Sequence, residues 1–160
     1  MRLTTLCFLV RRDEVLLAMK KRGFGAGKFN GVGGKVEAGE LVLDAAIREA
    51  EEEIGVKIAP PDALHRAGLR FYFDGKPEWN QECDVFIAKT WRGEPQETEE
   101  MKPQWFSITK LPFEKMWIDD PLWLPRVLKG ERLDAEFNFN ADGSVLLSHK
   151  INSIVFKKRS

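Results

Sequence analysis

The sequence predicts an α/β fold in which a mixed β-sheet is sandwiched between α-helices, an α/β/α arrangement. Short apolar runs typical of strands alternate with two longer segments that carry the apolar spacing of helices. The 160 residues, of which 43% are hydrophobic, suffice for one substantial core and hardly for two. We therefore expect a single domain that spans residues 1–160.

The chain is expected to begin with two strands, over residues 3–11 and 14–20, joined by a tight polar turn at Arg12 and Asp13. The apolar run within the first strand is short and lacks a small-residue cleavage site, so it is interpreted as a strand rather than a signal segment. Residues 23–35 follow as a loop that contains six glycines.

A helix is predicted next, over residues 41–54. Its apolar stripe is formed by residues at intervals of four, three and four positions, namely Leu43, Ile47, Ala50 and Ile54. Gly55 is suited to end this helix, because glycine readily adopts the left-handed conformation found just past the last helical turn.

The second half of the chain is predicted to contain further strands and one more helix. Alternating apolar residues and turn-forming residues identify the strands, and a longer apolar segment identifies the helix. The expected elements are a hairpin of strands 64–74 and 82–91, a short strand 103–107, a helix 120–129 and a β-hairpin over residues 135–151.

The first predicted helix carries three glutamates, Glu49, Glu52 and Glu53, three and four residues apart. This spacing gathers the carboxylates toward one side of the helix, where they repel one another unless a cation lies among them. Oxygen ligands of this kind suit Mg²⁺ or Mn²⁺ rather than zinc. Arg48 can reach Asp44 or Glu52 and orient a carboxylate. The alternative interpretation is a solvated acidic face with ordinary surface ion pairs.

The spacing of glycines and charged residues around this helix is highly specific. In chain order the pattern contains Gly34, Glu40, Arg48, Glu49, Glu52, Glu53 and Gly55. It resembles the Nudix box at every defined position, so the chain is similar to Nudix hydrolases. The resemblance implies the Nudix fold, Mg²⁺ or Mn²⁺ as cofactor, and hydrolysis of a diphosphate linked to another moiety.

The resemblance also implies roles for individual residues. Arg48 is the expected orienting residue. Hydrolysis requires a group that accepts a proton from the attacking water, and Glu53 is the first choice, with Glu52 the second. The expected metal ligands are the Gly34 carbonyl and the carboxylates of Glu49, Glu52, Glu53 and Glu100.

Segments outside the box, including residues 20–36 and 111–125, resemble the branch of the family that acts on oxidised purine nucleotides. The expected reaction is hydrolysis of triphosphates such as 8-oxo-dGTP and 2-oxo-dATP to the monophosphate and pyrophosphate, which would sanitise the nucleotide pool. Two alternatives stay open. The substrate is another nucleoside diphosphate derivative, such as ADP-ribose or a dinucleoside polyphosphate, or the chain is a non-catalytic nucleotide-binding module.

A purine pocket requires flat apolar faces and a few polar groups at the edge of the ring. Asp119 and Asp120 can meet that edge, and if they are buried together one of them is expected to keep a proton and act as a donor. The alternative is a helix N-cap followed by Pro121, with the neighbouring tryptophans as core residues. The remaining expected binding residues are Thr5, Lys20, Phe24, Asn30, Val32, Gly33, Gly34, Lys35, Tyr72, Phe73, Trp117, Ile118 and Trp123.

The strand near residue 72 has an uncertain register. An ungapped comparison with the family places Tyr72 and Asp74 on the pocket wall, whereas a shift of one residue places Phe71 and Phe73 there. Because side chains alternate between the two faces of a strand, the choice decides which set faces the ligand. Gln81 stands where the family has an apolar residue and adds polarity to the same region.

Composition limits the expected partners. The 25 basic and 25 acidic residues give a formal net charge of zero, so neither a nucleic acid polymer nor a membrane is an expected partner. Cys7 and Cys83 are far apart in apolar runs, which is typical of reduced core thiols in an intracellular, cytoplasmic protein. We expect a monomer whose partner is a small nucleotide.

Overall fold

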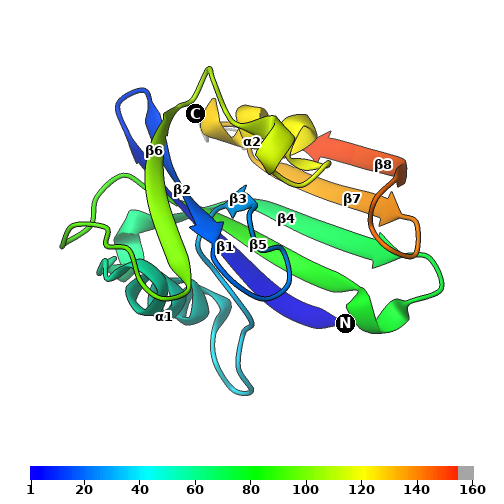
Figure 1. The fold of residues 1–160 in the computed structure, drawn as a ribbon, viewed down its shortest axis with the longest axis horizontal. Coiled ribbons are helices and arrows are strands. Elements are labelled where there is room, and N and C mark those ends of the chain that lie inside the picture. The colour runs from blue at the N-terminus through cyan, green and yellow to red at the C-terminus, as the bar shows by residue number, and fades with distance from the viewer. Residues whose placement is uncertain (155–160) are drawn as a thin grey trace, which may run out of the picture.

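In the computed structural model, the described residues 1–154 form an eight-stranded mixed sheet and two α-helices (Figure 1). Short 3₁₀ turns lie at Pro60–Asp62, Pro77–Trp79 and Phe113–Lys115. The helices and strands are β1 (Arg2–Arg11), β2 (Glu14–Lys20), β3 (Phe29–Asn30), α1 (Val42–Ile54), β4 (Ala63–Phe73), β5 (Gln81–Ala88), β6 (Met101–Ser107), α2 (Asp120–Leu128), β7 (Leu133–Phe139) and β8 (Leu146–Ser153).

Strand β1 is central to the sheet. It pairs antiparallel with β2, which follows it directly, and parallel with β5, which is reached only after the chain has passed through α1 and β4. The sheet continues from β5 through β4 and β7 to β8, while β3 and β6 both pair with β2. Parallel and antiparallel pairs therefore occur in one sheet, as predicted.

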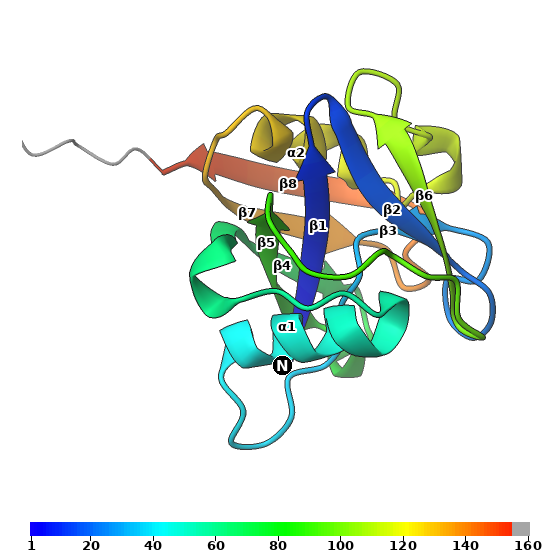
Figure 2. The same cartoon turned by 90° about the vertical axis from the view of Figure 1, so that its left-hand side faces the viewer.

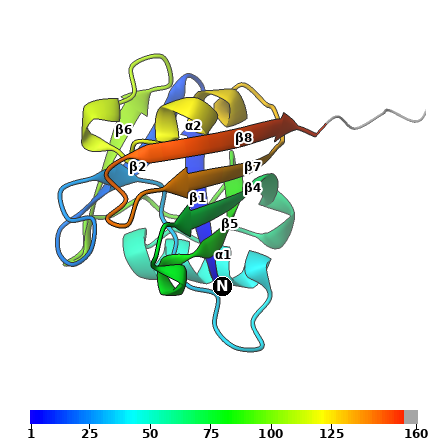
Figure 3. The same cartoon turned by 90° about the vertical axis from the view of Figure 1, so that its right-hand side faces the viewer.

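The two helices pack on opposite faces of β1. On one face, Cys7 and Leu9 belong to a buried cluster with Ala50 of α1. On the other face, Phe8 contacts Trp123 of α2, with ring centroids 6.1 Å apart. Because alternate residues of a strand point to opposite faces, β1 contributes to both halves of the core. Figures 2 and 3 show α1 and α2 separated by the sheet, which confirms the predicted α/β/α arrangement.

Helix α1 begins and ends within one residue of its prediction. Gly55 has φ +75°, and its N–H donates to the Glu51 carbonyl at 2.9 Å, so glycine ends the helix as expected. Ala50 and Ile54 are fully buried, and Leu43 and Ile47 pack at the edge of the same cluster. The predicted apolar stripe is therefore the face that lies on the sheet.

The largest boundary difference concerns β5, which ends at Ala88 rather than at residue 91. Ala88 pairs with Ala63, the first residue of β4, and the residues before Ala63 form a 3₁₀ turn that begins with two prolines. Proline cannot donate to a strand ladder, so β5 has no β4 partner beyond Ala88, and its pairing with β1 also ends there, at Leu9. Within residues 1–154, no helix has the length and apolar character needed to cross a membrane.

Replacement of Leu17 by alanine tests the core between the sheet and α2. Leu17 is fully buried in the cluster that also contains Trp123 and Leu124. We expect Leu17→Ala to lower the free energy of unfolding by about 2–5 kcal/mol, because it removes buried methyl groups and leaves a cavity. Urea denaturation measures the change. Leu147→Ala, at a side chain that is 57% exposed, should change it by less than about 0.5 kcal/mol. Equal losses in the two variants would contradict this assignment of the core.

Candidate active site

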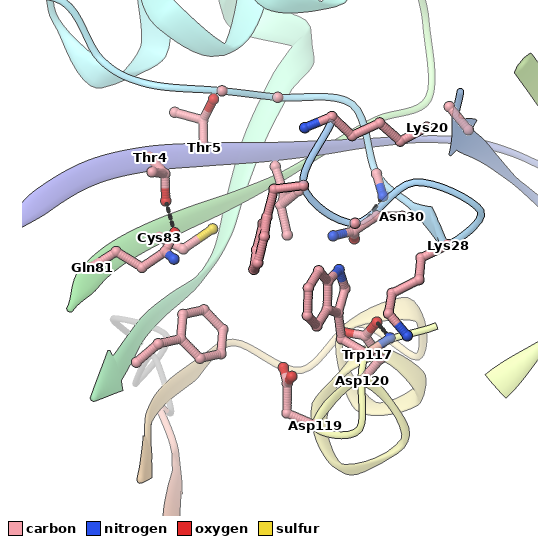
Figure 4. A pocket seen from close by; sticks show the side chains of 18 of the residues that line it. Thr4, Thr5, Lys20, Lys28, Asn30, Gln81, Cys83, Trp117, Asp119 and Asp120 are labelled. Carbon is pink, nitrogen blue, oxygen red and sulfur yellow. Dashed lines mark hydrogen bonds between the residues drawn. The ribbon is translucent and has the colours of Figure 1, made fainter. Parts of the chain in front are cut away.

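A cavity of about 440 Å³ lies between the first turn of α2, the glycine-rich loop and the strands around β1. Lys20 and Thr5 lie toward one end, and Asp119 and Asp120 lie toward the other (Figure 4). Glu49, Glu53 and Glu100 also line the cavity. One cavity therefore joins part of the Nudix-like segment to the predicted base pocket.

Aromatic rings form much of the cavity wall. Phe73 of β4 stacks on Phe139 of β7 with ring centroids 5.2 Å apart, and Phe71 lines the same wall. Phe24, from the glycine-rich loop, stacks on Trp117 at 5.4 Å. Its side chain is 70% exposed, so it lies at the mouth of the cavity. These rings offer the flat apolar surfaces that a purine requires.

The structure also decides the register of β4. Phe71 pairs with Gln81 of β5, and both residues line the cavity together with Phe73. Tyr72, which we expected beside Phe73, lies between the two phenylalanines in the strand and so points to the opposite face. The expectation for Tyr72 is corrected, because the pocket wall uses the register shifted by one residue.

Asp119 and Asp120 are almost fully buried, with 4% and 2% of their surface exposed. Trp123 donates its indole N–H to Asp119 Oδ2 at 2.8 Å, and the Trp117 backbone N–H donates to Asp120 Oδ2 at 3.1 Å. Burial raises the pKa of both carboxyls, and the charge of Asp119 raises the pKa of Asp120 further. The pair is therefore expected to retain a proton at pH values where an exposed aspartate has lost it.

The alternative for this pair, an N-cap followed by Pro121 with core tryptophans, describes its position but not its hydrogen bonds. Pro121 lies in the first turn of α2, and Trp123 is a fully buried core residue. Asp119 occupies the N-cap position of α2, yet its carboxylate makes no capping hydrogen bond to the helix backbone. It instead accepts the hydrogen bond from Trp123, a residue that is itself fully buried against the cavity. The carboxylates thus form the polar edge of the pocket, and Asp119 also orients Trp123 in the pocket wall.

Two further polar side chains meet the cavity. The Asn30 carbonyl oxygen accepts the Gly31 N–H at 2.8 Å, so its amide N–H groups remain as donors. The Thr5 hydroxyl is buried and has no hydrogen-bond partner within the part of the chain that the structure describes. Because a buried polar group without a partner is costly, the Thr5 hydroxyl is suited to bind a ligand atom.

The acidic end of the cavity is formed where α1 meets the glycine segment. Glu53 is 8% exposed and accepts the Gly33 N–H at 3.1 Å. Burial raises the pKa of Glu53 to about 8, and the charges of Glu49 and Glu100 add to this effect while the Gly33 N–H opposes it. The three carboxyls are therefore close enough to disfavour one another's charge.

Close packing against backbone requires glycine at position 33, and at position 34 a side chain would displace the Glu49 carboxylate. A Cβ on Gly33 would lie 1.8 Å from the Thr5 carbonyl oxygen, and a Cβ on Gly34 would lie 2.5 Å from Glu49 Oε1. The Gly34 carbonyl accepts the Thr5 N–H at 2.9 Å and keeps a second lone pair. Only glycine at position 33 allows this approach of the backbone to β1.

Arg48 holds the carboxylates of the Nudix-like segment in place. It binds Glu40 through two hydrogen bonds of 2.8 and 3.0 Å, and it donates to Glu49 at 3.0 Å and to Glu52 at 3.2 Å. The predicted reach to Glu52 is thus observed. Glu52 lies on the outer side of α1 and is not part of the cavity wall. The orienting role expected of Arg48 agrees with these contacts.

The donor atoms at the acidic end are of the type that a hard divalent cation prefers. Glu49, Glu53 and Glu100, with the Gly34 carbonyl, supply only oxygen, and a cation would relieve the mutual repulsion of the carboxylates. Among the described residues, however, no three acidic, histidine or cysteine side chains already stand at ligating positions. Glu52, also an expected ligand, is held outward by Arg48. Ligation would therefore require side-chain rotation.

Besides Tyr72, three of the expected binding residues lie away from the cavity. Val32 is buried in the α1 cluster, where its N–H bonds to Cys7, and Ile118 is 44% exposed. Lys35 offers its carbonyl to Arg48 rather than its side chain to the cavity. In each case an adjacent residue, Gly33, Gly34 or Trp117, lines the cavity instead.

The cavity also includes residues that sequence reasoning did not select. Phe139 lies in the alternating hairpin that was predicted, but only the pairing of β7 with β4 brings it beside Phe73. Lys28 lies in the glycine-rich loop, with its ammonium 5.2 Å from the centre of the Trp117 ring. Phe139 belongs to no motif, and the resemblance of residues 20–36 gives Lys28 no role. The pairing of distant strands was the missing information for Phe139, and the contact of the loop with Trp117 was the missing information for Lys28.

With this geometry established, comparison with known proteins identifies the class. The NUDIX domain pattern matches residues 1–127, and the chain belongs to the Nudix hydrolase family, whose members generally use divalent metal cations. It is 46% identical to the oxidized purine nucleoside triphosphate hydrolase of Danio rerio and 42% identical to that of Mus musculus, each over 96% of both chains. The crystal structure of a MutT protein from Bacillus halodurans superposes with a TM-score of 0.83 at 28% identity, covering 95% of this chain and 98% of the other.

Replacement of Asp120 by asparagine tests the energetic cost of the buried pair. Because folding raises the pKa of Asp120 above its ordinary value of 3.8, the native state loses stability as pH rises from that value through the raised one. Asparagine keeps an acceptor for the Trp117 N–H and carries no charge. We expect Asp120→Asn to be more stable than the parent at pH 8 by roughly 1–3 kcal/mol, and less so at pH 4.

Urea denaturation at several pH values measures this difference. Asp74→Asn, at an exposed position, is the matched control and should show no pH-dependent gain. A stability difference for Asp120→Asn that is the same at pH 4 and pH 8 would contradict the assigned cost of ionising the pair.

Proposed function

We propose that this protein is a Mg²⁺-dependent enzyme that hydrolyses oxidised purine nucleoside triphosphates, such as 8-oxo-dGTP and 2-oxo-dATP, to the monophosphate and pyrophosphate. The observation that carries the proposal is that one cavity has two different ends. One is the acidic end from the Nudix box, and the other is an aromatic end, called the closed end, whose wall contains the buried residues Asp119, Asp120 and Trp123. The names of the relatives from Danio rerio and Mus musculus support the same substrate class. The reaction would remove damaged precursors from the nucleotide pool.

Base recognition follows from the groups at the closed end. A purine between Trp117 and the phenylalanine wall would direct its polar edge toward Asp119 and Asp120. A pair that holds one proton offers a donor and an acceptor at once, because one carboxyl is neutral and the other is charged. Oxidised guanine and oxidised adenine differ in the order of donors and acceptors along this edge. A pair whose proton can lie on either carboxyl accommodates both.

The phosphates would lie at the opposite end, beside Lys20 and the glycine backbone. Glu49, Glu53, Glu100 and the Gly34 carbonyl would hold the magnesium ion. When bound, the ion neutralises phosphate charge and lowers the pKa of a coordinated water. Of the two candidates for the general base, Glu53 faces the cavity and Glu52 does not, so the geometry favours Glu53. Its hydrogen bond from Gly33 fixes the direction of the carboxylate.

We also propose that the chain acts as a monomeric single domain in a reducing compartment such as the cytoplasm. Cys7 and Cys83 are free and buried, and burial raises the pKa of each thiol to about 12. Such thiols are poorly reactive and need no partner cysteine. Every element required for the proposed site comes from the same chain.

An initial-rate panel tests the substrate class. We expect the protein with Mg²⁺ to hydrolyse 8-oxo-dGTP and 2-oxo-dATP faster than dGTP, ADP-ribose or a dinucleoside polyphosphate at equal concentration, as the names of the relatives from Danio rerio and Mus musculus suggest. Identification of the phosphate products by ion-exchange chromatography completes the measurement. Faster cleavage of ADP-ribose than of both oxidised triphosphates would refute the proposal. Binding of an oxidised triphosphate without product would favour a non-catalytic module.

Replacement of Glu53 by glutamine tests the catalytic assignment. Glutamine keeps an acceptor for the Gly33 N–H but cannot take a proton from water, so we expect kcat to fall by roughly 10²- to 10⁴-fold. Steady-state kinetics measures the loss. Glu51→Gln, on the exposed side of the same helix, is the matched control and should retain full activity. Undiminished turnover by Glu53→Gln would sink the assignment of the base.

A further inference from the structure

Lys28 is placed at the closed end of the cavity although no motif selects it. Its N–H donates to the Gly25 carbonyl at 3.1 Å, and its own carbonyl accepts the Lys20 N–H at 3.2 Å, so its backbone is held at both sides. The ammonium lies 5.2 Å from the centre of the Trp117 ring, a favourable cation–π distance. Figure 4 shows its side chain directed along Trp117 toward Asp120.

The positive charge of Lys28 is not neutralised by a close partner. In residues 1–154, its ammonium forms no ion pair of the kind seen between Arg126 and Glu131. Its field therefore reaches Asp120, where it lowers the pKa of the carboxyl against the larger raising effect of burial. Solvent screens this charge little, because the carboxyls of the pair are buried.

The other groups that face the pair carry no charge near neutral pH. Trp123 of α2 and the Trp117 backbone donate hydrogen bonds to it. Cys83 of β5 also lies in the cavity wall, and burial raises its thiol pKa to about 12, so it carries no charge near neutral pH. Within the described residues, Lys28 is thus the cation whose charge acts on the pair.

We propose that Lys28 is a specificity-determining residue that acts through Asp119 and Asp120, by limiting the pH range over which the pair keeps its proton. This inference rests on the proposed function, because it concerns which purine edge the same pocket accepts. A base that presents a carbonyl to the pair needs the protonated carboxyl as donor, and loses it when the pair becomes fully ionised. Lys28 favours that ionisation, so it lowers the pH above which the pocket no longer binds such bases.

Carbon-13 NMR of the aspartate carboxyls tests the charge effect directly, in protein without nucleotide or metal. Asp119→Asn and Asp120→Asn assign the two resonances. We expect Lys28→Met to move the titration midpoint of the pair upward, because a positive charge that favours ionisation is lost. Lys28→Arg should restore the parent midpoint, and Lys89→Met, at an exposed position, should leave it unchanged. An unshifted midpoint in Lys28→Met overturns the inference.

The pH dependence of KM for 8-oxo-dGTP and 2-oxo-dATP tests the consequence for specificity. We expect KM to begin rising at a higher pH in Lys28→Met than in the parent, by the same shift as the NMR midpoint. The value of kcat should change less than twofold, since the phosphate end of the cavity is unchanged. A shifted NMR titration with an unshifted KM profile would overturn the specificity role. Failure of the parent protein to hydrolyse either nucleotide would instead refute the proposed function, and the NMR result would still decide whether Lys28 controls the pair.

Discussion

The approach of the glycine segment to strand β1 is the constraint on which the site depends. The segment runs beside β1, with hydrogen bonds from the Thr5 N–H to the Gly34 carbonyl at 2.9 Å and from the Val32 N–H to the Cys7 carbonyl at 3.0 Å. Gly33 leaves no space for a side chain against the Thr5 carbonyl. Because α1 follows a few residues later, this contact fixes where its carboxylates meet the cavity. The base pocket and the acidic end are thereby parts of one site.

Both ends of the cavity contain carboxyl groups that burial makes difficult to ionise. Burial raises the pKa of Asp119 and Asp120 at the closed end, and at the acidic end it acts most strongly on Glu53. Proteins tolerate such groups where they act on a ligand, since well-packed apolar residues would be more stable there. In the proposed reaction a retained proton relieves one end and a divalent cation the other. The closed end is thus suited to the base of a nucleotide, and the acidic end, with a divalent cation, is suited to its phosphates.

Local signals were sufficient for most elements and for part of the site. The bounds of α1 follow from its apolar stripe and from Gly55, and Arg48 contacts the carboxylates as its spacing predicts. The end of β5 could not be predicted in the same way, because it depends on where β4 stops offering a partner. Likewise, Tyr72 and Phe71 are both aromatic and both suit a strand. Only pairing with β5 and β7 decides which of them faces the ligand.

The sequence by itself determined the spacing of the Nudix box and most of the helices and strands, because these depend on residues within a few turns of chain. The fold and the nucleotide chemistry were expected from the family resemblance that this spacing carries. Tertiary structure alone decided which members of each predicted set share the cavity. It turns Glu53 inward and Glu52 outward, and it places Lys28 beside the buried pair. The physical reason is that burial and electrostatic fields arise from contacts between distant segments. Spacing along the chain does not encode them.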